Sequence, residues 1–154
     1  MVLALQRTFS PRHDQWITPA PTETDAGLQV EVIFTTMEAT LSALKKAASL
    51  ANQLSARINL LVPQVVPYPL PLMSPPVLLD WTERRFRVLA EHYAADTTVQ
   101  IYLCRDRMEA LLAVLRPQSI VVLGMRRKWW PAFESKLQRR LRRAGHEVIV
   151  TKPE

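Results

Sequence analysis

The sequence predicts one α/β domain built on a doubly wound, five-stranded parallel sheet with helices on both faces. Short segments rich in β-branched and apolar residues alternate along the chain with longer segments whose apolar residues recur at helical spacing. Such alternation favours parallel strands joined by right-handed helical crossovers. A length of 154 residues, of which 48% are hydrophobic, suits a single hydrophobic core.

The first 27 residues differ from the rest of the chain. Residues 1–27 contain three prolines and Gly27 and show no sustained periodicity, so we expect a flexible N-terminal arm. A partner-binding tail anchored by Trp16 and Ile17 is the alternative. The domain itself is expected to occupy residues 28–154.

The first strand, helix and second strand follow in order. Residues 30–35 are predicted to form a strand because β-branched and aromatic residues dominate the segment. Residues 39–56 have alanines and leucines recurring on one side of a helix, and small alanines let a helix pack close to a sheet. The nearly continuous apolar run 58–62 is typical of a parallel strand covered on both faces.

A proline-rich connection spans residues 63–76. Proline lacks the N–H that a helix interior or a central strand needs, so we expect neither there. A stiff crossover loop is the favoured interpretation. A lid, or a docking segment in polyproline II conformation, is the alternative.

The middle of the chain continues the alternation. Residues 77–94 are predicted to form a helix and residues 98–104 the third strand. Asp106 stands at an N-cap position. A short helix is expected over residues 108–115, and Pro117 ends it.

The last part of the chain carries the clearest strand. Residues 119–124, Ser-Ile-Val-Val-Leu-Gly, form the fourth predicted strand. Residues 134–143 are predicted to form a short basic helix that buries Leu137 and Leu141. Residues 147–151 form the last strand.

Positive charge is concentrated in one part of the chain. The net charge is +6, and residues 126–143 hold eight basic residues and one acid, Glu134. The rest of the chain is therefore close to neutral, and the basicity is a local patch. No apolar run is long enough for a membrane span, and the start lacks a secretory signal, so a cytoplasmic protein is expected.

Residues capable of catalysis or metal binding are sparse. Cys104 is the only cysteine, and the three histidines lack metal-ligand spacing, so neither a disulfide nor a metal site is expected. A lone cysteine is usually a small buried side chain; a redox role, with a thiol pKa lowered by Arg105, is the alternative. Neither a nucleophile with a base nor paired carboxylates can be recognised, so we expect no enzyme and no cofactor.

Three segments together resemble the universal stress protein family. Ala-Leu-Lys-Lys-Ala at residues 43–47 resembles the family's first helix, and Leu-Leu-Val at residues 60–62, followed by prolines, resembles the end of its second strand. Residues 119–124 resemble its fourth strand. The resemblance implies a Rossmann-like fold with strand order 3-2-1-4-5, a role in stress response, and a ligand crevice where the order reverses, between strands one and four.

The chain departs from that family where ATP is bound. At the position of the family's nucleotide-holding Asp the chain has Thr35. Members that bind ATP have several glycines after strand four, which let backbone N–H groups close on phosphates. Here Gly124 is followed by Met125 and two arginines, and the next glycine is Gly145. We therefore expect a degenerate nucleotide-binding site that does not hold ATP in the family manner.

Three functions follow as hypotheses. The leading one is a non-enzymatic, homodimeric regulatory or interaction module. The first alternative is a sensor of an anionic small ligand, a nucleotide or a cyclic dinucleotide, bound at Thr35, Thr36, Val62, Gly124, Arg126, Arg127 and Lys128. The second is a non-specific nucleic-acid binder that uses Lys136, Arg139, Arg140 and Arg143, although nucleic acid is the less expected partner because no reading motif is present.

A homodimer is expected through the last strand. The resemblance implies that this strand pairs with its symmetry mate, and an uncovered apolar edge invites such pairing. The candidate interface residues are His146, Val148, Ile149 and Val150.

Overall fold

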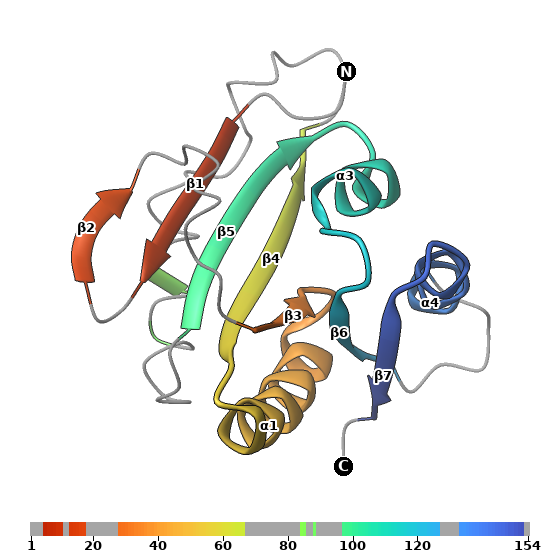
Figure 1. The fold of residues 1–154 in the computed structure, drawn as a ribbon. Coiled ribbons are helices and arrows are strands. Elements are labelled where there is room, and N and C mark those ends of the chain that lie inside the picture. Colours follow the sequence, from red (N-terminus) through yellow and green to blue (C-terminus); the bar gives the residue numbers. More distant parts are fainter. Residues whose placement is uncertain are drawn as a thin grey trace.

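The computed structural model describes residues 5–10, 13–17, 28–66, 84, 85, 88, 97–126 and 133–152. One seven-stranded sheet, in the order β2-β1-β5-β4-β3-β6-β7, forms its centre (Figure 1). Its strands are β1 (Leu5–Ser10), β2 (His13–Ile17), β3 (Gln29–Ile33), β4 (Arg57–Val65), β5 (Thr97–Cys104), β6 (Ile120–Gly124) and β7 (Glu147–Thr151).

The five strands from β3 to β7 are parallel, and their spatial order is the predicted 3-2-1-4-5. The described helices are α1 (Met37–Leu54), α3 (Arg107–Val114) and α4 (Phe133–Arg143). Helix α1 packs on one face of the sheet, and α3 and α4 pack on the other (Figure 1). The predicted doubly wound α/β fold is thus confirmed. The helix expected over residues 77–94 lies outside the described residues except at 84, 85 and 88, which are helical.

The expectation of an arm without regular structure is wrong for two segments of residues 1–27. Strands β1 and β2 form an antiparallel pair, and β1 also pairs antiparallel with β5, from Leu5 opposite Leu103 to Phe9 opposite Val99. Without β1, β5 would be an open sheet edge with unpaired backbone groups. The stabilising partner is distant in sequence, which is why local periodicity did not indicate these strands.

The proline-rich connection begins later than expected, because Pro63 lies inside central strand β4. Pro63 is opposite Tyr102 of β5, whereas the pairing of β4 with β3 ends at Leu61, opposite Ile33. Phe34 N–H donates to Leu61 O, so Leu61 faces β3, and by alternation Pro63 faces the same way. An N–H at residue 63 would point beyond the end of β3. Proline at this position therefore costs no hydrogen bond between β4 and β3.

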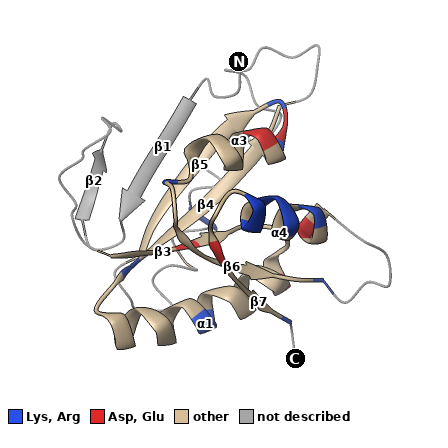
Figure 2. Ribbon diagram, turned by 45° about the vertical axis from the view of Figure 1, so that its right-hand side comes forward, with Lys and Arg blue, Asp and Glu red and all other residues tan. Residues whose placement is uncertain are grey.

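Two apolar clusters fill the faces of the sheet. The cluster under α1 includes the buried helix residues Ala43, Leu44, Ala47 and Ala51. The opposite cluster buries Leu137 and Leu141 of α4 fully, as predicted. Lys and Arg are concentrated along α4 (Figure 2). None of the helices described here is long and apolar enough to cross a bilayer.

Candidate functional site

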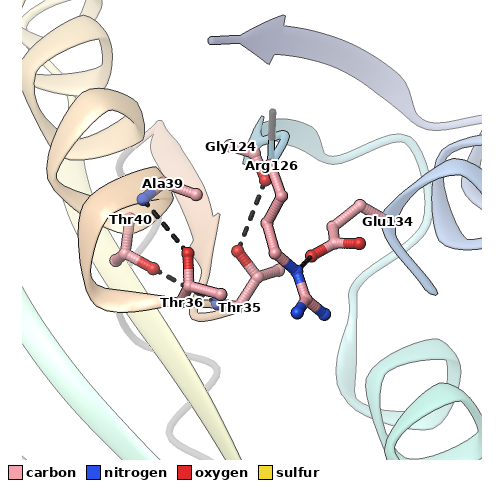
Figure 3. A network of polar contacts seen from close by, with 7 residues as sticks. All are labelled: Thr35, Thr36, Ala39, Thr40, Gly124, Arg126 and Glu134. Carbon is pink, nitrogen blue, oxygen red and sulfur yellow. Dashed lines mark hydrogen bonds and ion pairs between the residues drawn. The ribbon is translucent and has the colours of Figure 1, made fainter. Parts of the chain in front are cut away.

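The strand order reverses between β3 and β6, so the residues that follow these two strands lie side by side. This position brings together four of the predicted ligand residues: Thr35, Thr36, Gly124 and Arg126 (Figure 3). Val62 is not among them, because it is buried in the apolar cluster under α1. Residues 127 and 128, the predicted Arg127 and Lys128, lie outside the described residues.

The threonines bind the protein's own backbone. Thr35 Oγ1 donates to Gly124 O over 3.3 Å, which links the ends of β3 and β6. The backbone N–H of Thr35 donates to Thr40 Oγ1 over 3.2 Å. Thr36 caps α1, since its Oγ1 accepts a hydrogen bond from Ala39 N–H over 3.2 Å. The Thr40 hydroxyl therefore ties the start of α1 to the end of β3, while the Thr35 hydroxyl joins β3 to β6 (Figure 3).

Gly124 serves close packing between a strand and a helix. A Cβ placed on Gly124 would lie 2.0 Å from the backbone oxygen of Ala39, far inside any allowed contact. The next amide is also engaged, because Met125 N–H donates to Thr151 O over 2.8 Å. Gly124 is thus covered by α1, and the Met125 N–H is used by β7 and is not free for a phosphate.

Arg126 is bound to a buried carboxylate. Its Nε donates to Oε1 of Glu134 over 2.6 Å, and the side chains are 32% and 1% exposed respectively. Glu134 lies in the first turn of α4, where a negative charge is favoured. Its Oε2 has no hydrogen-bond partner among the described residues. A buried negative charge next to Arg126 weakens the attraction of this position for an anion.

Sequence reasoning selected Arg126 but gave Glu134 no role. The available signal was modest: Glu134 is the one acid in a strongly basic stretch, and it opens the predicted helix. Only the folded chain shows that the acid points inward to the arginine rather than outward to solvent.

A second polar group, which sequence reasoning missed, crosses β3, β4 and β5 on the α3–α4 side of the sheet. Asn59 Nδ2 donates to Glu31 Oε2 over 2.7 Å and to Gln100 Oε1 over 3.2 Å. Tyr102 O–H donates to the same Gln100 oxygen over 2.6 Å. The signal was a polar residue within the apolar part of each strand: Glu31 is opposite Asn59, and Gln100 lies two residues beyond Thr98, which is opposite Asn59.

In this polar row, formed by Glu31, Asn59, Gln100 and Tyr102, burial has the largest effect on the pKa values. It raises the pKa of Glu31 to about 7, against the opposing effects of the Asn59 hydrogen bond and the charge of Arg116. Burial, followed by the charge of Glu31, raises the pKa of Tyr102 as well. The row therefore holds a carboxyl group that titrates near neutral pH inside the sheet.

Cys104 is buried, and its Sγ donates to Gln64 O over 3.7 Å. Burial and the charge of Asp106 raise the pKa of the Cys104 thiol to about 11, although Arg107 acts in the opposite direction. A reactive thiol requires a lowered pKa. The geometry thus contradicts the redox alternative, which expected Arg105 to lower it.

Strand β7 is the last strand of the sheet on its side. Val148 is buried, and Ile149 and Val150 are half-buried. His146 is also buried, with its Nδ1 accepting from Ser119 N–H over 3.1 Å. Of the predicted interface residues, His146 is therefore engaged within its own chain.

The comparisons with known proteins bring no further assignment. No family model and no curated protein matches this sequence. In the described parts of the chain, no three His, Cys, Asp or Glu side chains gather in a way that could hold a metal ion.

Proposed function

We propose that this chain is a universal stress protein-like module that acts in regulation or interaction, without catalysis and without ATP bound in the family manner. The observation that carries the proposal is the close packing of Gly124 against Ala39, where not even a Cβ would fit between β6 and α1. The hydrogen bond from Thr35 to Gly124 supports it, because it joins the strands where a ligand would otherwise enter. A cytoplasmic location is part of this proposal.

The same geometry makes an anion sensor the weaker candidate. Recognition of a phosphate would use the guanidinium of Arg126. That group is already paired with Glu134, whose buried carboxylate an incoming anion would have to approach. An anionic ligand would therefore have to break a short charge-assisted hydrogen bond or tolerate a nearby like charge.

A thermal-shift measurement on the full chain tests the proposal. We expect no change in Tm with ATP, AMP, a cyclic dinucleotide or inorganic phosphate at millimolar concentration. A ligand present at 100 times its Kd would stabilise by about 2.7 kcal/mol, or roughly 5–10 °C in a chain of this size. A shift of that size that disappears in the charge-balanced double variant Arg126→Gln, Glu134→Gln would overturn the proposal and establish the sensor.

The homodimer in this proposal uses the free side of β7. Glu147 N–H donates to Ser119 O, and Thr151 O accepts from Met125, so these residues face β6. Because backbone groups alternate along a strand, those of Val148 and Val150 face away from the sheet. These outward groups are available for a second copy of the strand.

Proline substitution on β7 tests the dimer. Val150→Pro removes an outward N–H and leaves the pairing with β6 intact, so we expect a folded monomer in light scattering after size exclusion, where the wild type is a dimer. Ile149→Pro is the matched control, because it removes an inward N–H and should destabilise the fold instead. A monomeric wild type at micromolar concentration, or a dimeric Val150→Pro, would contradict this interface.

A further inference from the structure

Helix α4 has one buried side and one strongly basic side. Leu137 and Leu141 are fully buried. Figure 2 shows that Lys and Arg are concentrated along α4, and Lys136, Arg139, Arg140 and Arg143 of this helix are exposed. Their spacing of three, four and seven residues places them on one side of the helix, over about 10 Å of its length.

These four cations have no acidic partner within the described residues. The ion pair at this helix joins Arg126 to Glu134, and that carboxylate is buried at the inner side. A neighbouring cation, Arg142, differs, because its Nη2 lies 3.0 Å from the side-chain amide of Gln138 once that amide is oriented for hydrogen bonding. The charges of the four exposed cations thus add instead of cancelling.

A stabilising effect on helix α4 does not explain all four exposed basic residues. Cations near the C-terminus of a helix are favoured by its dipole, which covers Arg140 and Arg143 in the last turn. Lys136 is the fourth residue of α4, close to the end where the dipole disfavours a cation. The helix dipole therefore does not explain the positive charge at Lys136.

We propose that the exposed side of α4 binds the phosphate backbone of a nucleic acid without reading its sequence. The inference rests on the interaction role proposed above and names the partner. Arginine-rich surfaces with little apolar area are typical of nucleic-acid interfaces. A stripe of 10 Å spans roughly three phosphates of one strand of a duplex, which bear one charge per 3.4 Å.

Two other kinds of partner, a membrane surface and a protein, fit the helix less well. A membrane-surface helix inserts an apolar side into the bilayer, but both leucines of α4 are used in the core. A protein interface needs buried apolar or aromatic anchors. The exposed large hydrophobic residues of the described chain are Leu28, Leu54, Val65 and Val88, and none is on α4.

Fluorescence anisotropy with the full chain tests this inference, using labelled mixed-sequence 30-nucleotide DNA as a single strand and as a duplex. We expect the affinity to fall as salt is added. In a plot of the logarithm of the association constant against the logarithm of the salt concentration, the slope should have a magnitude of about 0.7 per phosphate contact for the single strand. Removing two contacts in Arg139→Gln, Arg140→Gln should lower the slope by about 1.4 and weaken binding roughly 10- to 30-fold at 0.1 M salt. A second pair, Lys136→Gln, Arg143→Gln, should behave alike.

The matched control is Lys45→Gln, Lys46→Gln, which removes two exposed cations from α1 on the opposite side of the sheet. It should leave affinity and slope within twofold of the wild type. Absence of salt-dependent DNA binding, equal loss in the control, or binding to anionic lipid vesicles or polyglutamate but not to DNA would each overturn the inference. Circular dichroism confirms that every variant is folded. The dimer and nucleotide measurements are separate, so either proposal can fail alone.

Discussion

Arg126 Nε donates to Glu134 Oε1 over 2.6 Å, and this pair joins the end of β6 to the first turn of α4. Arg126 is the cation best placed to hold a phosphate where the strand order reverses between β3 and β6. Its side chain is instead used in an ion pair within the protein. Together with the hydrogen bond from Thr35 to Gly124, it fixes the relative positions of β3, β6 and α4. Exposed positive charge lies further along, on α4.

Removing Arg126 should destabilise the protein more than removing its partner's charge. Arg126→Ala leaves Glu134 buried and uncompensated, and breaking a fully buried pair costs about 3–5 kcal/mol. Because Arg126 is one-third exposed, we expect about 2 kcal/mol in the free energy of unfolding, measured by urea denaturation. Glu134→Gln should cost less, because the amide oxygen can still accept from Nε.

A double-mutant cycle supplies the control. Adding Glu134→Gln to Arg126→Ala should recover part of the lost stability, because the buried charge is then gone. If the double variant instead loses the sum of the two single effects, the pair contributes no coupling and the internal role of Arg126 is wrong.

Substitutions of Gly124, the last residue of β6, and of Gly145, which follows α4, are expected to destabilise the protein for different reasons. Gly124→Ala places a Cβ against the backbone oxygen of Ala39, so α1 must move, and we expect a loss of about 3 kcal/mol or more in urea denaturation. Gly145→Ala meets no neighbouring atom, but its φ of +93° is strained for an L side chain, at a cost of about 1–2 kcal/mol.

Asparagine separates these two reasons. It tolerates left-handed conformations, so Gly145→Asn should be milder than Gly145→Ala. Gly124→Asn should be at least as damaging as Gly124→Ala, because the obstacle there is space. Equal tolerance at both positions would contradict the packing role given to Gly124.

Sequence reasoning predicted the elements whose signal is local. The strand at residues 147–151 matches β7 at both ends, and Asp106 caps α3 as expected, with its side chain accepting from Glu109 N–H. The order of the parallel strands followed from the resemblance, and the described sheet agrees with it. Periodicity, cap residues and turn residues are properties of a few neighbouring positions, so one sequence is enough to read them.

What the sequence did not reveal depends on residues far apart in the chain. Strand β1 forms because β5, more than 90 residues later, offers an open edge. Pro63 is tolerated in a central strand because β3 happens to be shorter than β4. In the same way, the row from Glu31 to Gln100 becomes a network only when three strands are in register. Such relations need the fold before they can be recognised.

Cys104 should react slowly in the folded protein. A thiol pKa of about 11, compared with 9.0 for an ordinary thiol, means about 100-fold less thiolate at neutral pH, and burial adds a steric barrier. We expect 5,5′-dithiobis(2-nitrobenzoate) to label Cys104 at least 100-fold more slowly in buffer than in 8 M urea. Labelling at the rate of the unfolded chain would show that the thiol is accessible and restore the redox alternative.

Glu31 should make stability depend on pH in a direction opposite to that of a salt-bridged acid. Its pKa rises from 4.5 in the unfolded chain to about 7 in the folded protein, so the folded state holds the proton more tightly. The stabilising contribution is complete below pH 4.5 and is lost as the pH rises through about 7. A rise of the pKa from 4.5 to about 7 corresponds to about 3 kcal/mol in the free energy of unfolding.

The variant Glu31→Gln isolates this effect from every other titrating group. The neutral amide keeps the shape and an acceptor for Asn59 but cannot ionise, so the variant should be more stable than the wild type at pH 8 and close to it at pH 4.5. Urea denaturation at half-unit pH intervals measures the difference. Glu147→Gln, which neutralises an exposed carboxylate on β7, is the control and should follow the wild type. If the wild type gains stability relative to Glu31→Gln between pH 5 and 8, the surroundings of Glu31 stabilise its charged form. The conclusion that burial raises the pKa of Glu31 would then be wrong.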